Sequence, residues 1–217
     1  MFLRQVKILG DYITVCEQSV GEYSEKHSRF IATLYPCKSE EEAASLLSAH
    51  KAKYWDAKHN VYAYILKDKT SKFSDDGEPH STAGKPVYDC LDHSGICDAL
   101  IVVTRYFGGI LLGTGGLVRA YSSAAKAAIE AAKRVTMVEC GIFELTMPYS
   151  EQKKITLMLA DSGIKILDTV YEESVRIKFA VKLPEIAGFE DTLREISGDK
   201  LKAIQVSTEI LPIIIKK

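Results

Sequence analysis

Residues 98–128 constrain the fold of this chain more than any other stretch. The segment opens with the apolar, β-branched run Leu100-Ile101-Val102-Val103, which is typical of a strand buried on both faces. Five glycines follow within nine residues, and an alanine-rich segment of high helix propensity ends the stretch. A strand, a glycine loop and a helix in this order often form an anion site, because the N–H groups that begin a helix are unpaired and lie at the positive end of its dipole. The loop is therefore expected either to hold a ligand or to make a tight turn.

Common nucleotide-binding motifs do not fit this loop. A P-loop needs Lys-Ser or Lys-Thr after its last glycine, whereas Gly113 is followed by Thr114. A dinucleotide fingerprint that starts at Gly113 has Gly115 in register, but Val118 stands where the third glycine should be. No serine of the chain has the glycine spacing of a hydrolase nucleophile elbow. Both common nucleotide-binding folds are therefore disfavoured.

Two arginines flank the loop. Arg119 falls in the first turn of the expected helix, where a cation opposes the helix dipole by a few tenths to about 1 kcal/mol. A locally unfavourable residue is a candidate for function, and Arg105 lies at the other end of the same loop. Together with glycine N–H groups, the two arginines predict a cradle for a phosphate, including one in an RNA backbone. The alternative is that both arginines pair with carboxylates of a neighbouring loop. The glycines concerned are Gly108, Gly109, Gly113, Gly115 and Gly116.

A long polar loop, residues 67–86, precedes this stretch and carries three acids within four residues. Such loops are more often functional than inert. Asp75, Asp76 and Glu78 have the chemistry to bind a hard cation or to act as an acid–base pair. Their spacing differs from that of a calcium loop, which favours a turn whose carboxylates order the site. Lys85, at the end of the loop, is expected to join the phosphate contacts.

Composition narrows the functional classes. The net charge of −1 argues against nucleic-acid binding through bulk positive charge, so any such contact must come from a few well-placed cations. The five cysteines include no C-x-x-C pair, which predicts free thiols, no metal site and no cofactor. The sequence has neither a long apolar run nor a signal peptide, so we expect no membrane association and a cytoplasmic location.

Two α+β domains are expected, an N-terminal domain of residues 1–135 and a C-terminal domain of residues 136–217. Before the central stretch, a helix is expected from a Ser39 cap to about Trp55, since Glu42 completes a capping box. After residue 135, the order strand, helix, two strands, helix, strand matches the ferredoxin-like βαββαβ plan. The central helix is expected to bury one face, made by Leu117, Tyr121, Ala124, Ala125, Ala128, Ile129 and Ala132.

Four ordered blocks of the sequence are KHSRFIATLYPCKSEEEA (26–43), DAKHNVYAYIL (56–66), SDDGEPHSTAGKP (74–86) and VVTRYFGGILLGTGGLVRAYSSAA (102–125). Together these blocks resemble the IMPACT/YigZ family, many members of which have Ser-Gly where this chain has His80-Ser81. The resemblance implies an N-terminal α/β domain like a small-subunit ribosomal protein domain and domain IV of elongation factor G. It also implies a C-terminal domain like domain V of that factor.

The resemblance also implies a function connected with translation, because eukaryotic relatives regulate translation under amino-acid starvation. The leading hypothesis is a protein without catalytic activity that contacts RNA or the ribosome. A rival is an enzyme, or a binding protein, for a small anionic ligand or nucleotide at the glycine loop. A third hypothesis is an interaction module that binds a translation factor.

Overall fold

A computed structural model describes residues 10–213, and these divide into two compact units. One unit spans residues 12–136, and the other spans residues 137–213 together with residues 10 and 11. Among the described residues, no helix is long and apolar enough to cross a membrane.

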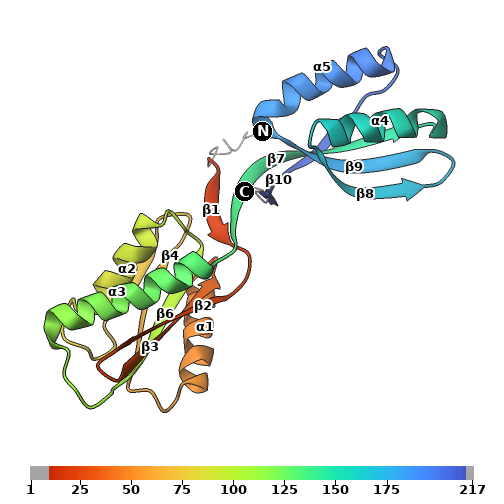
Figure 1. Ribbon diagram of the computed structural model, residues 1–217. Coiled ribbons are helices and arrows are strands. Elements are labelled where there is room, and N and C mark those ends of the chain that lie inside the picture. The colour runs from red at the N-terminus through yellow and green to blue at the C-terminus, as the bar shows by residue number, and fades with distance from the viewer. Residues whose placement is uncertain (1–9, 214–217) are drawn as a thin grey trace, which may run out of the picture. The chain divides into compact units, whose positions relative to one another are not determined.

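The first unit is built on one antiparallel sheet with the strand order β2-β3-β6-β4-β5 (Figure 1). Helices α2 and α3 cover one face of this sheet, and α1 packs on the other. The elements in chain order are β1 (Tyr12–Val15), β2 (Ser19–Glu25), β3 (Ser28–Pro36), α1 (Glu40–Lys53), β4 (His59–Ile65), β5 (Ser71–Ser74), α2 (Gly84–His93), β6 (Ala99–Tyr106) and α3 (Gly113–Ala131).

The central position of β6 explains its composition. Every residue from Ala99 to Arg105 is buried, because helices cover both faces of the sheet at this strand. One face contributes Ile101 and Val103 to the core beneath α2 and α3, and the other contributes Leu100 and Val102 to the core beneath α1. The strand expected at this stretch is therefore confirmed, together with the burial of both of its faces.

The second unit has its own sheet, in which β9 lies between β7 and β8, and β10 pairs with β7. Its core joins this sheet to α4 and α5 through Phe143, Phe179 and Phe189. The order strand, helix, two strands, helix, strand agrees with the expected plan, and the α+β class is confirmed. The elements are β7 (Arg134–Met147), α4 (Tyr149–Asp161), β8 (Lys165–Tyr171), β9 (Val175–Lys182), a 3-10 turn at Leu183–Glu185, α5 (Ile186–Ser197) and β10 (Ile204–Ile213).

Three features of the first unit differ from expectation. The expected long loop contains the short strand β5, and its last residues begin α2, a helix of ten residues. Strand β2 has no counterpart in the sequence-based prediction. Helix α3 begins at Gly113, so three of the five loop glycines belong to its first turn.

Candidate functional site

A buried ion pair lies at the centre of the first unit. Nη1 of Arg105 donates to Oε1 of Glu78 at 2.6 Å, and the hydroxyl of Tyr121 donates to the same oxygen at 2.7 Å. Arg105 is 7% exposed and Tyr121 is completely buried, while Nε2 of His59 lies 4.0 Å from the shared oxygen. Burial, and then the negative charge of Glu78, raise the pKa of Tyr121. The guanidinium of Arg105 is thus engaged inside the protein rather than presented to solvent.

Asp75 and Asp76, the other two acids of the predicted site, also act within the protein. Oδ1 of Asp75 accepts the backbone N–H of Gly84 at 2.7 Å and that of Ala83 at 3.1 Å, so this carboxylate satisfies N–H groups at the start of α2. Oδ2 of Asp76 accepts the N–H of Asn60 at 2.7 Å, and its Oδ1 pairs with Lys51 of α1 at 2.7 Å. These contacts fix the segment between β5 and α2 to α1 and β4.

A second buried polar chain lies beneath α1. The hydroxyl of Thr104 donates to Oδ1 of Asn60 at 2.8 Å, so Nε2 of His50 must donate to Thr104, also at 2.8 Å. Nδ1 of His50 then accepts the hydroxyl of Tyr35 at 2.8 Å. This arrangement requires the neutral imidazole. Burial, and then the positive charge of Lys53, lower the pKa of His50 to about 4.

The glycine loop is locked to the turn between β2 and β3. The N–H of Gly108 donates to Oγ of Ser28 at 3.1 Å. A Cβ on Gly108 would overlap the backbone of His27, so only glycine permits this close approach. Gly109 and Gly113 have φ angles of +84° and +70°, a region that other residues rarely adopt. Gly108, Gly109 and Gly113 are therefore required by the conformation and packing of the turn itself.

The start of α3 differs from the buried cluster because its polar groups face outward. The Ncap residue, Leu112, makes no side-chain cap, and Gly113, Thr114 and Gly115 are exposed. Arg119 is exposed, and its Nη1 lies 3.9 Å from the position that a Cβ on Gly115 would occupy. The guanidinium therefore folds back over the first turn of α3. No acid in the described part of the chain forms an ion pair with it.

Exposed apolar side chains gather around this helix start. Ile110 is 45% exposed and Leu111 is 82% exposed, and both belong to the glycine loop. The hydroxyl of Tyr106 donates to Oδ1 of Asp56 at 2.8 Å, so the segment that follows α1 lies at the same end of the domain. We name this surface the glycine-loop end and define it as residues 26–29, 53–58 and 106–119.

The remaining predicted residue, Lys85, lies in the first turn of α2. Its ammonium group pairs with Asp89 and lies 5.5 Å from the ring of Tyr88. The pair is exposed, and surface pairs of this kind contribute at most about 1 kcal/mol. Lys85 therefore remains accessible to an external ligand.

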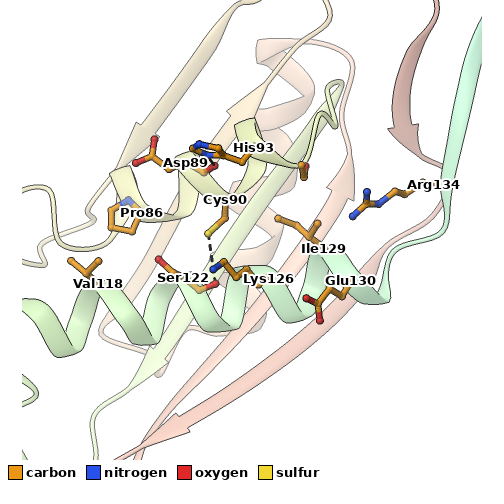
Figure 2. A pocket seen from close by; sticks show the side chains of 11 residues that line it. Pro86, Asp89, Cys90, His93, Val118, Ser122, Lys126, Ile129, Glu130 and Arg134 are labelled. Atoms are coloured by element: carbon orange, nitrogen blue, oxygen red, sulfur yellow. Dashed lines mark hydrogen bonds between the residues drawn. The ribbon is translucent and has the colours of Figure 1, made fainter.

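An open groove runs between α2 and α3 (Figure 2). Its volume is about 690 Å³. Cys90 lies between the helices and donates to the carbonyl of Ser122 at 3.7 Å, and burial raises the pKa of its thiol. A nucleophile would need the opposite shift. The side chains around the thiol include Pro86, His93, Val118, Lys126, Ile129, Glu130 and Arg134.

The described residues contain no cluster of three or more His, Cys, Asp or Glu side chains able to hold a metal ion. Three residues of the buried networks, His50, His59 and Tyr121, were not among the predicted site residues. A weak signal existed for His59, which directly precedes an apolar strand, and for Tyr121, the only aromatic residue on the alanine-rich face of α3. A tryptophan at the end of a helix is most simply a packing residue, yet Trp55 is 82% exposed.

Comparisons with known proteins cover both units. Residues 26–129 match the Impact N-terminal domain, and residues 145–200 match a domain of unknown function, DUF1949. The chain is 35% identical to IMPACT family member YvyE of Bacillus subtilis, over 89% of this chain and 90% of that protein. It is 33% identical to IMPACT family member YigZ of Escherichia coli, over 83% of this chain and 91% of that protein.

Eukaryotic relatives match a shorter part of the chain. Protein IMPACT of Xenopus laevis is 35% identical over 42% of this chain and 30% of that protein. A crystal structure described as that of a hypothetical protein shares 30% identity, covers 91% of this chain and 98% of its own, and superposes with a TM-score of 0.59. The identities and coverage of the bacterial relatives, together with the domain match, show that the chain belongs to the IMPACT family.

Proposed function

We propose that this protein binds RNA of the translation apparatus through its glycine-loop end and carries out no catalysis. One observation carries the proposal: the guanidinium of Arg119 folds back over an uncapped helix start made of Gly113, Thr114 and Gly115. Unpaired N–H groups, the helix dipole and a free cation converge there, which is the chemistry that holds a phosphate.

The neighbouring hairpin extends this positive surface. Gly108 joins the glycine loop to the turn at Lys26 and His27, which places exposed Lys26 close to the loop. A run of phosphates therefore meets cations from two segments. Local placement of this kind is compatible with a net charge of −1, because only the glycine-loop end has to be positive.

The buried cluster has a different role in this proposal. Arg105, Glu78 and Tyr121 hold the segment before α2 against β6 and α3, and Asp75 and Asp76 fix its ends. Arg105, Glu78 and Tyr121 are buried, and the two aspartates bond groups of the protein, so these residues order the site rather than contact RNA. The resemblance to a family with translation regulators supports the choice of a ribosomal RNA and a cytoplasmic site of action.

The proposal is tested with Arg119→Ala. We expect weaker co-sedimentation with ribosomes and weaker retention of ribosomal RNA on filters, with the slope of log affinity against log salt reduced by about 1, because one phosphate contact is lost. Lys165→Ala, which removes an exposed cation from β8 in the other unit, is the matched control. Equal binding by a folded Arg119→Ala protein and wild type would contradict the proposal.

The groove between α2 and α3 favours a second candidate, an interaction module for a translation factor. Its lining alternates apolar side chains such as Val118 and Ile129 with the charged groups of Lys126 and Glu130 (Figure 2). A mixed surface of this kind is typical of protein contacts. Lys126→Glu, which reverses a charge of the groove outside the glycine-loop end, should then weaken capture of a protein from nuclease-treated lysate while leaving RNA retention unchanged. Nuclease-sensitive capture would instead place RNA between the two proteins.

A further inference from the structure

The one tryptophan of the chain is in an unusual position. Trp55 follows α1 directly and is 82% exposed. Tryptophan is highly buried on average, because its large apolar ring is costly to leave in water. An exposed tryptophan next to other exposed apolar side chains marks a contact surface. Trp55 therefore requires an explanation that packing within the domain does not provide.

A second exposed aromatic ring, Phe107, lies at the same end of the domain. Phe107 is 54% exposed and directly follows Tyr106, whose hydroxyl bonds Asp56, the residue after Trp55. The buried guanidinium of Arg105 lies 5.4 Å from the ring of Phe107, so one side of the ring rests on a fixed cation. The close contact between Gly108 and the backbone of His27 fixes the chain that follows Phe107. Both rings are therefore exposed at the end of the domain where β6 stops, and contacts of Tyr106 and Arg105 fix the backbone beside each of them.

Cations flank both rings. Lys53 lies on the last turn of α1, and Lys58 lies between Trp55 and β4. Arg29 lies opposite Tyr106 on the neighbouring strand, where its guanidinium is exposed and paired with the carboxylate of Glu22 at 2.8 Å. Exposed aromatic rings interleaved with cations are the combination that binds single-stranded nucleic acid, since the rings stack on bases while the cations meet phosphates.

We infer that Trp55 and Phe107 stack on unpaired bases, so that the RNA bound at the glycine-loop end is single-stranded. This inference rests on the proposed RNA-binding function and names the form of RNA that the site takes. In a double helix the bases are already stacked on one another, and their faces are not available to side chains. Stacking is also tolerant of sequence, because every base presents an aromatic face.

The experiment uses fluorescence excited at the long-wavelength edge of the indole band, where the 11 tyrosines do not absorb, so that the emission reports on Trp55 alone. The protein is titrated with a short unstructured oligouridylate and with an RNA hairpin whose bases are all paired except for a tight loop. We expect the single strand to quench the tryptophan emission and the duplex to leave it nearly unchanged. Filter retention of the same labelled RNAs measures affinity independently of the fluorescence.

Substitutions complete the test. Trp55→Ala should weaken retention of the single strand by roughly 5- to 150-fold, the range for losing one stacked base, and Trp55→Phe should lose less because a ring remains. Phe107→Ala should act in the same direction. Leu157→Ala, which removes an exposed apolar side chain from α4 of the other unit, is the control and should have no effect.

The outcomes separate the two proposals. The stacking inference is wrong if RNA binds without a change in emission, if the duplex binds as tightly as the single strand, and if Trp55→Ala retains full affinity. In that case the phosphate contacts of the proposed function are still supported. If neither RNA nor ribosomes bind wild type, both proposals are wrong. If the emission changes only on addition of a nuclease-treated protein fraction, Trp55 is a protein contact and the stacking inference is again wrong.

Discussion

Arg105 and Arg119 lie at the two ends of one glycine-rich segment, and the structure gives them opposite surroundings. Arg105 is 7% exposed and bonds Glu78, whereas Arg119 is exposed and lies over the open start of α3. A buried ion pair has already lost its water and needs its partner, while an exposed guanidinium keeps its water until a ligand replaces it. Two arginines that look equivalent in the sequence are thus suited to different tasks, one to holding the fold and one to binding.

The largest loss of stability is expected from breaking the ion pair between Arg105 and Glu78. Arg105→Met leaves the Glu78 carboxylate uncompensated beneath Tyr121, which should destabilise the first unit by about 3–5 kcal/mol. Urea unfolding monitored by hydrogen exchange of the β6 amides measures this change directly in that unit. Lys85→Met, which removes an exposed cation, should change the free energy of unfolding by at most about 0.5 kcal/mol.

The double variant Glu78→Leu/Arg105→Met sharpens the comparison. Removing both charges eliminates the uncompensated carboxylate, so the double variant should be more stable than Arg105→Met alone. It should still be less stable than wild type, because the hydroxyl of Tyr121 loses its acceptor. If Arg105→Met were as stable as wild type but failed to bind RNA, the distinction between the two arginines would not hold.

The next largest effect is a loss of stability in mild acid. The pKa of His50 is about 4 in the folded protein and 6.5 in the reference state, so the unfolded chain binds more protons between these values. The contribution of the neutral imidazole is fully present above pH 6.5 and is lost as the pH falls from 6.5 to 4, on the order of 3 kcal/mol in total. Urea unfolding at a series of pH values measures it.

His50→Gln should flatten this pH profile, because the group that takes up the proton in the unfolded chain is gone. His93→Gln is the matched control, since His93 is exposed at the end of α2 and its removal should leave the slope unchanged. A profile as steep in His50→Gln as in wild type would assign the acid sensitivity to other groups.

The elements with strong local signals were predictable from the sequence. The buried run at β6, the alanine-rich face of α3 and the Ser39 cap are all confirmed, the cap by the N–H of Glu42 donating to Oγ of Ser39 at 3.2 Å. Periodicity, propensity and capping are properties of neighbouring residues, so the sequence displays them directly. The order of elements in the second unit was visible for the same reason.

The parts that depend on other segments of the chain were not predictable in the same way. Strand β5 pairs with β4 across a short hairpin, with Ser71 opposite Ile65, and nothing in its own residues marks a strand. The hydrogen bond between Glu78 and Arg105 joins residues 27 positions apart. From the sequence, the arginine could pair either with a carboxylate of the protein or with an external anion. The exposure of Trp55 depends on where α1 ends, at Lys53, slightly before the expected position.

A smaller stability effect separates the two kinds of glycine in the loop. Gly108→Ala would force a Cβ against the backbone of His27, so the loop and the hairpin must move apart. We expect a loss on the order of 2 kcal/mol, as for other overpacked sites, together with faster hydrogen exchange at the turn between β2 and β3. Retention of wild-type stability and exchange would show that the loop is not locked to the hairpin.

The smallest expected change, at Gly115, has the opposite sign. Gly115 lies in the first turn of α3, and a Cβ there would meet only Nη1 of Arg119, at 3.9 Å. Alanine favours the helix over glycine, so Gly115→Ala should stabilise the first unit by up to about 1 kcal/mol. The same methyl group stands where a phosphate would approach the N–H groups, and RNA retention should therefore fall. A variant that is more stable and binds RNA as tightly as wild type would show that no phosphate binds to the N–H groups of this turn. The guanidinium of Arg119 would then contact the RNA without help from these N–H groups.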